Sequence, residues 1–153
     1  MRMITYLVLF FFALPLFSEE RKHGGKAIEV KVEAGTKDGK MVFIPNDLTF
    51  ERGKHYKLVI SNPSPNAHYF STDAFATRIY TRKIEVVGPN GKALAEVYGD
   101  IHDIEVFPNS TVEWYFYPMK KGKNLKLYCH KDNHEEMGVV GTINIVGSLS
   151  FGK

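Results

Sequence analysis

Cysteine is almost absent from this chain, which has Cys129 alone among its 153 residues. A single cysteine cannot form an internal disulfide, so a small domain held together by disulfides is excluded. In an oxidising compartment such a thiol must stay free, pair with another chain or bind a metal. The residues around Cys129 therefore carry most of the information on function.

Strong charge and long apolar runs are also lacking. The formal net charge of +3 is too weak to indicate nucleic-acid binding. The run from Ile4 to Phe17 is about 14 residues long, whereas spanning a bilayer takes about 20. With Arg2 before it, this run predicts a signal peptide at residues 1–18, although no Ala-x-Ala triplet marks the cleavage site. An uncleaved anchor is the alternative. We expect a periplasmic or secreted protein without stable membrane insertion after cleavage.

Enzyme motifs are missing as well. The chain has no evident Ser/His/Asp arrangement, phosphate-binding loop or paired acid motif, so no catalytic activity is predicted. Apolar residues make up 44% of the chain, as in globular proteins. We expect a disordered polar lead-in at residues 19–26, one folded domain at residues 27–147 and a C-terminal tail at residues 148–153.

Short stretches of alternating apolar and polar residues dominate the domain. Between strand-like runs lie turn signals rich in Gly, Pro, Asn and Asp, and only Ser71 to Arg82 is helix-like, with Phe75 and Ile79 on one face. The predicted strands are Ala27–Val32, Met41–Pro45, Leu48–Phe50, Tyr56–Asn62, Ile84–Val87, Ala93–Tyr98, Ile104–Phe107, Thr111–Tyr117, Leu125–Tyr128 and Gly141–Val146. This pattern predicts an all-β sandwich or barrel with one short helix between strands.

Cys129 and His134 lie on one short loop between two predicted strands, with four residues between them. A thiolate with an imidazole selects copper or zinc. The alternative is a buried, inert cysteine beside solvated histidines. His68 follows another strand through a Pro-braced loop, so it also lies at an end of the predicted sandwich. If the ends coincide, His68, Cys129 and His134 form one metal site; otherwise His68 is a partly buried loop histidine.

Several of these residues together resemble the cupredoxin family. They are Asn62, His68, Phe70, Tyr128, Cys129, His134 and Gly141–Ile143. The Cys-x4-His spacing is more similar to azurin and rusticyanin than to plastocyanin. The resemblance extends over about residues 40–147.

The resemblance implies an eight-stranded Greek-key sandwich with a mononuclear type 1 (blue) copper site. Cys129, His68 and His134 would be the ligands, Asn62 a hydrogen-bonding residue around them, and His134 the point where electrons leave. The implied function is one-electron transport through a copper ion cycling between Cu(I) and Cu(II), with an unidentified redox protein as partner. The alternatives are a copper carrier or chaperone in copper homeostasis and an accessory domain of an oxidoreductase complex.

The fourth ligand departs from the family pattern. In the relatives named above, the axial Met lies two residues before the Gly of the last strand, and counting back from Gly141 gives Val139. Met137 could reach the metal only through a tighter loop. We expect Val139 in the axial position and keep Met137 as an uncertain axial ligand.

Two other groups of residues carry weaker signals. His130 follows Cys129 directly, but no two histidines are spaced as His-x-His, which multicopper oxidases require, so we expect a surface or second-site histidine. A set of basic residues predicts either an acidic redox partner or ordinary solubility. The set comprises Arg78, Arg82, Lys83, Lys120, Lys121, Lys123 and Lys126.

Overall fold

The computed structural model describes residues 26–148. The predicted signal peptide lies outside the described residues, as do all of the predicted lead-in except Lys26 and all of the predicted tail except Ser148. Within the described part of the chain, no helix has the length and apolar character needed to cross a membrane.

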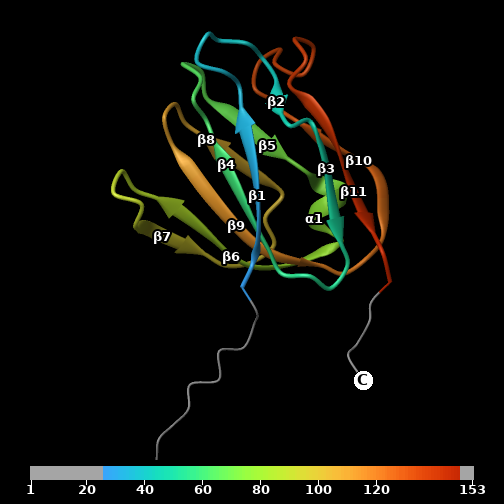
Figure 1. The fold of residues 1–153 in the computed structure, drawn as a ribbon. Coiled ribbons are helices and arrows are strands. Elements are labelled where there is room, and N and C mark those ends of the chain that lie inside the picture. Colours follow the sequence, from blue (N-terminus) through green and yellow to red (C-terminus); the bar gives the residue numbers. More distant parts are fainter. Residues whose placement is uncertain (1–25, 149–153) are drawn as a thin grey trace, which may run out of the picture.

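Two β-sheets face each other, and both termini of the described chain leave at the same end (Figure 1). The first sheet has six strands in the order β2-β1-β4-β9-β6-β7. Its strands are β1 (Ile28–Ala34), β2 (Phe43–Ile44), β4 (Tyr56–Ser61), β6 (Ile79–Val87), β7 (Ala93–Val97) and β9 (Thr111–Pro118).

The second sheet has five strands in the order β3-β11-β10-β5-β8. Its strands are β3 (Asp47–Glu51), β5 (His68–Ser71), β8 (Asp103–Val106), β10 (Gly122–Tyr128) and β11 (Val140–Val146), and helix α1 (Asp73–Ala76) follows β5. Two pairings are parallel, β1 with β4 and β3 with β11, so strands distant in sequence join in each sheet. The predicted all-β sandwich with one short helix is confirmed.

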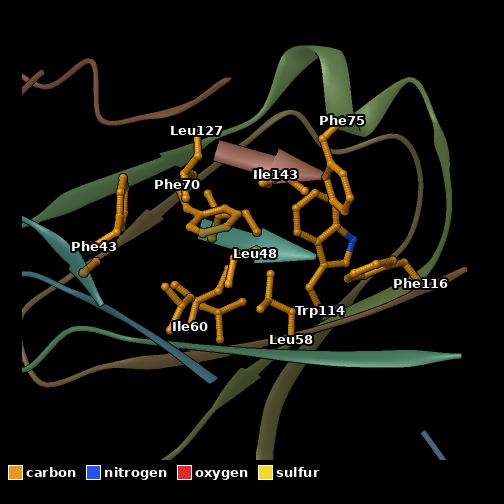
Figure 2. Packing of buried hydrophobic residues seen from close by; sticks show 14 of the residues in the cluster. Phe43, Leu48, Leu58, Ile60, Phe70, Phe75, Trp114, Phe116, Leu127 and Ile143 are labelled. Atoms are coloured by element: carbon orange, nitrogen blue, oxygen red, sulfur yellow. The ribbon is translucent and has the colours of Figure 1, made fainter. Parts of the chain in front are cut away.

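Alternating side chains build the core between the sheets. In β9 every second residue is buried, so Trp114 and Phe116 point inward while Tyr115 and Tyr117 face outward. Figure 2 shows Trp114 and Phe116 packed with Phe75 from α1. The ring centroids of Phe75 and Trp114 are 5.9 Å apart in an edge-to-face arrangement. The single helix thus closes one end of the aromatic core.

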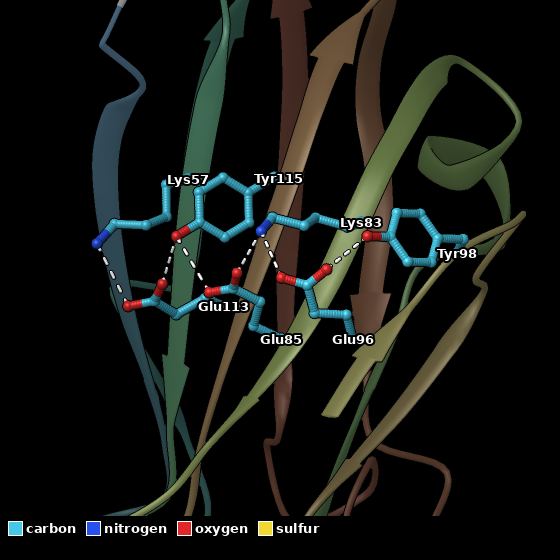
Figure 3. Close-up of polar contacts among 7 residues, drawn as sticks. All are labelled: Lys57, Lys83, Glu85, Glu96, Tyr98, Glu113 and Tyr115. Atoms are coloured by element: carbon cyan, nitrogen blue, oxygen red, sulfur yellow. Dashed lines mark hydrogen bonds and ion pairs between the residues drawn. The ribbon is translucent and has the colours of Figure 1, made fainter. Parts of the chain in front are cut away.

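Charged and phenolic side chains cover the outer face of the six-stranded sheet (Figure 3). Lys57 pairs with Glu113 at 3.3 Å, and Lys83 pairs with both Glu85 and Glu96, the latter at 2.7 Å. Glu85 lies directly opposite Glu96 in the β6–β7 register, so the Lys83 ammonium offsets a like-charge contact. Alternating charges therefore leave this face polar and internally paired.

The structure differs from the sequence predictions in local detail. Helix α1 ends at Ala76, and Ile79, expected on its apolar face, begins β6 instead. The described residues form eleven strands, whereas the resemblance implied eight and alternation predicted ten; β5 (His68–Ser71) is the strand that was not predicted. The predicted break after Pro45, which has no N–H to donate to a ladder, separates β2 from β3.

Candidate metal centre

Three ligand-type side chains meet at the end of the sandwich opposite the termini. His68 begins β5, Cys129 directly follows β10, and His134 lies in the β10–β11 loop. One ligand atom from each residue lies within 4.8 Å of the others. His68 and Cys129 are fully buried, and His134 keeps 7% of its surface exposed. The structure thus brings together the three residues predicted as ligands.

The Cys129 sulfur is contacted from strand β5 and from the β10–β11 loop. The Tyr69 backbone N–H donates a hydrogen bond to Sγ at 3.2 Å, and Sγ lies 3.4 Å from His134 Nδ1. The Cys129 N–H donates to the Val139 carbonyl at 3.0 Å, which closes the loop after β10. A hydrogen bond to a thiolate sulfur is a known means of tuning a metal centre. Sequence reasoning had not singled out Tyr69, since any residue supplies a backbone N–H.

Ser64 fixes the protonation of the His68 ring. Its hydroxyl donates to the Asn66 carbonyl at 3.2 Å and also lies 3.2 Å from His68 Nε2. A hydroxyl has one proton, so Ser64 Oγ must accept from Nε2–H. The lone pair of His68 is therefore on Nδ1, which is buried without a hydrogen-bond partner in the described structure. An imidazole held in this way is ready to bind a metal through Nδ1.

Burial keeps the His68 ring neutral. The pKa of His68 is lowered from 6.5 to about 4, mainly by loss of solvation and also by the nearby His134 and Lys131 charges. The rings of His68 and His134 are 5.0 Å apart between centroids. Since only the neutral imidazole binds a metal, the site is ready for a cation at neutral pH.

Asn62 organises the loop that delivers His68. Its Nδ2 donates to the carbonyls of Asn66 and Val106, both at 2.7 Å, and its Oδ1 accepts from the Ser64 N–H at 2.9 Å. The side chain is only 1% exposed. Asn62 therefore acts on the site through the loop backbone and through Ser64, without a hydrogen bond to any of the three ligand-type residues.

Gly35 permits close approach to His68 from the β1–β2 loop. A Cβ at this position would lie 2.6 Å from Ser64 Cβ and 2.7 Å from His68 Nε2. The residue also has a φ of +75°, which favours glycine. The sequence identified a turn here but gave no sign of contact with His68, because the two residues meet only in the folded chain.

Backbone hydrogen bonds shape the loop from Cys129 to Val139. The His134 N–H donates to Lys131 at 2.9 Å, and the Val139 N–H donates to His134 at 3.0 Å. The Met137 N–H donates to Asn133 at 3.0 Å. These tight turns point His134 inward while leaving most of the loop surface exposed.

The two candidates for the axial position lie in different environments. Val139 is fully buried and belongs to the core cluster, whereas Met137 is 52% exposed. An exposed thioether on the outer side of the loop would have to turn inward to contact a metal. This placement favours the expectation that Val139 covers the site.

His130 turns away from the cluster, as strand alternation predicts. Its ring stacks on Tyr69 with centroids 4.1 Å apart, and its Nδ1 lies 2.9 Å from Ser71 Oγ. Asp103 lies 3.6 Å from the same nitrogen. His130 is therefore a surface residue beside the site.

The donor set fits a copper ion. Two imidazoles and one thiolate match the ligands of mononuclear electron-transfer copper sites. A structural zinc ion takes four ligands, and the described residues bring only three His, Cys, Asp or Glu side chains together here. The orphaned Nδ1 of His68 is a further sign, since a buried nitrogen with a lone pair ordinarily has a partner.

Comparison with known proteins identifies the fold. The chain matches no family model and no curated protein sequence. Among solved structures, auracyanin B is 12% identical over 78% of this chain and 88% of its own, with a TM-score of 0.51.

Two multicopper oxidases are similar over a part of their length. The enzyme from Campylobacter jejuni is 18% identical over 81% of this chain, with a TM-score of 0.54, and the enzyme from Aquifex aeolicus is 16% identical over 79%, with a TM-score of 0.55. The chain spans only 31% and 30% of these two oxidases. At such identities the likeness establishes the architecture alone. The chain has the cupredoxin fold, and its His68–Cys129–His134 cluster is of the kind typical of type 1 copper sites.

Proposed function

We propose that this protein is an exported one-electron carrier that binds a single copper ion through His68, Cys129 and His134. The observation that carries the proposal is the convergence of these three ligand-type side chains in a buried cluster within 4.8 Å. Copper, when bound, supplies a one-electron couple between Cu(I) and Cu(II). The chain supplies the ligands, their orientation and the exclusion of water.

Rigidity supports a carrier. Electron transfer is fast when the ligands stay in place in both oxidation states, and here each ligand is fixed by neighbours. His68 is held by Ser64, and Cys129 is held by the Tyr69 N–H and by the Val139 carbonyl. If Val139 fills the axial position, its apolar side chain favours the lower charge of Cu(I), so the potential should be high.

Electrons should pass through the surface next to His134. It is the least buried of the three ligand-type residues, and Met137, Gly138 and Val140 are exposed on the same loop. Small and apolar side chains around a partly exposed ligand suit brief contact with a redox protein. Charge introduced at Val140 should slow exchange with a partner while leaving the spectrum unchanged.

Burial argues against the alternative of a copper chaperone. A chaperone hands over its metal by ligand exchange, so its ligands must be reachable by those of the receiving protein. Here His68 and Cys129 have no exposed surface. Reversible one-electron cycling without loss of copper would support the carrier, and rapid transfer of Cu(I) to a competing chelator would support the chaperone.

The optical spectrum of the Cu(II)-loaded protein tests the proposal. We expect an intense blue or green band from thiolate-to-copper charge transfer. Cys129→Ser should abolish the band, and His68→Ala should strongly weaken copper retention. His130→Ala is the matched control, since that residue is adjacent to Cys129 but points outward, and it should keep the band. A colourless copper-loaded wild type, or a coloured Cys129→Ser variant, contradicts a type 1 site.

A further inference from the structure

Positive charge gathers at the end of the sandwich opposite the metal centre. Three connections meet there: the β3–β4 turn, the α1–β6 junction and the β9–β10 turn. They carry Arg52, Arg78, Lys120 and Lys121, and Lys123 follows at the start of β10; we call these five cations the basic pole. Figure 1 places this end beside both termini of the described chain and away from the β10–β11 loop.

Hydrogen bonds fix the basic pole as one surface. The Arg52 guanidinium donates from Nε and Nη2 to the Met119 carbonyl at 3.1 and 3.0 Å. The N–H groups of Met119 and Lys120 both donate to the Arg78 carbonyl, at 2.8 and 3.0 Å. Arg78, Lys120 and Lys121 line a shallow hollow of about 340 Å³ together with Thr77. The backbone segments that carry these charges therefore have fixed relative positions.

The charges of the basic pole are not compensated. Within residues 26–148, none of its five cations has an ion-pair partner. The nearby acid, Glu51, pairs with Lys54 at 2.8 Å. By contrast, Lys57 and Lys83 on the outer sheet face are each bound to two glutamates.

The opposite end carries charges of both signs: Lys37 in the β1–β2 loop has no ion-pair partner among the described residues, and the metal-site loop carries acids. On the metal-site loop, Asp132 and Glu136 have no ion-pair partner among the described residues, while Lys131 is paired with Glu105 at 3.2 Å. A protein polarised in this way orients itself in front of a charged surface, because the field acts on the whole charge distribution. The basic end turns toward an anionic surface and the metal end turns away.

Two further features of the basic pole fit a lipid surface. Met119 and Val146 are 39% and 43% exposed at this end, so apolar side chains lie among the cations. The described chain also begins here, at Lys26, and the apolar run from Ile4 to Phe17 precedes it by fewer than ten residues. If this run is retained as an anchor, it holds this end of the domain next to a bilayer.

We propose that the basic pole docks on an anionic lipid surface, so that the metal centre faces away from the bilayer. An acidic redox protein fits this end less well, because it would sit a full strand length from the metal ligands. β10 alone spans seven residues, which is about 23 Å. Each basic residue near an anionic membrane adds to the affinity, and the effect is screened by salt.

Vesicle sedimentation with the protein isolated from the exported fraction tests the proposal. We expect binding to vesicles of phosphatidylcholine mixed with phosphatidylglycerol to exceed binding to pure phosphatidylcholine, and the excess to vanish at high salt. The triple variant Lys120→Glu/Lys121→Glu/Lys123→Glu should bind the anionic vesicles about a hundredfold more weakly than the wild type. Lys37→Glu/Lys40→Glu/Lys92→Glu is the matched control, with the same net charge but with its changes in turns away from the basic pole.

Fluorescence of the buried Trp114 shows that each variant is folded. The proposal is supported if the control triple variant keeps most of the excess binding. Equal binding to neutral and anionic vesicles would overturn it, as would an equal loss in both variants, which would indicate net charge alone. Retention of an acidic redox protein by the wild type, lost in the first variant and without vesicle binding, would assign the basic pole to a protein partner instead.

Discussion

The two loops that deliver the ligands are built in different ways. Buried side chains hold the β4–β5 loop, where Asn62 makes three hydrogen bonds and Ser64 bonds to His68 Nε2. Backbone hydrogen bonds hold the β10–β11 loop between Cys129 and Val139, and most of its side chains face solvent. One loop therefore depends on the identity of its residues, and the other depends mainly on its length and turns.

This difference in hydrogen bonding separates positions whose side chains define the site from positions whose side chains can change. Side chains on the β10–β11 loop can vary without disturbing the ligands, apart from those that face inward, so its surface can adapt to a partner. The β4–β5 loop should tolerate few substitutions, because its buried side-chain amide and hydroxyl form hydrogen bonds with polar groups that water does not reach. Substitutions in and around the two loops test this difference.

Asn62→Ala should show the largest effect on stability. It leaves the Val106 carbonyl and the Ser64 N–H without partners, and a cost of about 3 kcal/mol in the free energy of unfolding is expected. Asn133→Ala is the control in the other loop, where the side chain is exposed, and it should cost less than about 0.5 kcal/mol. Chemical denaturation of both metal-free variants provides the measurement. Similar costs for the two would remove the distinction between the loops.

Gly35→Ala should cost more than Gly39→Ala. Both glycines have positive φ, at +75° and +81°, so both substitutions strain the backbone. Only at Gly35 does the new Cβ meet Ser64 and His68, whereas nothing lies within 4 Å at Gly39. The excess should be about 2 kcal/mol in thermal or chemical unfolding, accompanied by weaker copper binding at Gly35 alone. If Gly35→Ala and Gly39→Ala lose the same stability and the same copper affinity, the close packing against His68 contributes to neither.

The metal-free protein should lose stability in mild acid. The pKa of His68 is about 4 in the folded protein and about 6.5 in the unfolded chain, so the unfolded chain binds the proton more readily. This contribution is fully present above pH 6.5 and is lost as the pH falls toward 4, by about 3 kcal/mol. Unfolding measured across this range should show a slope that His68→Gln reduces. An unchanged slope would show that another group titrates.

Val139→Met should have the smallest effect on the fold and a clear effect on the copper. A thioether beside the metal stabilises Cu(II) more than Cu(I), so the reduction potential should fall by tens of millivolts. Met137→Leu should leave the potential unchanged, since that side chain is half exposed. Voltammetry of the copper-loaded variants tests both. A rise in potential with Met137→Leu would place Met137 on the metal and show that the count from Gly141 is wrong.

The sequence alone was sufficient for the architecture and for the three ligand-type positions. Alternation in Thr111–Tyr117 and Tyr56–Asn62 reflects burial of one face, which is a local property, and β9 and β4 lie there. Cys129 and His134 were recognisable because they share one loop. Assigning His68 to the same site required the assumption that its loop and the loop of Cys129 and His134 lie at the same end of the sandwich. The structure shows that they do.

Contacts between loops lay beyond the sequence. Gly35 meets Ser64 and His68 only after two distant loops fold together. Ser64 lies in the same loop as His68, but serine is not distinctive in a turn, so its contact with the ring could not be foreseen. The helix boundary was missed because Phe75 and Ile79 have helical spacing, yet the six-stranded sheet recruits Ile79 into β6 opposite Pro118. Tertiary pairing overrode the local pattern there.

The position of β11 has a consequence for when the site can form. This last described strand lies between β3 and β10, so the five-stranded sheet is split until it docks. The loop bearing Cys129 and His134 is anchored on β11 through the Tyr128–Val140 pair. During synthesis the ligands therefore remain apart until almost the whole chain is available. Metal selection therefore takes place where folding finishes, so the metal supply at that place decides which ion the site acquires.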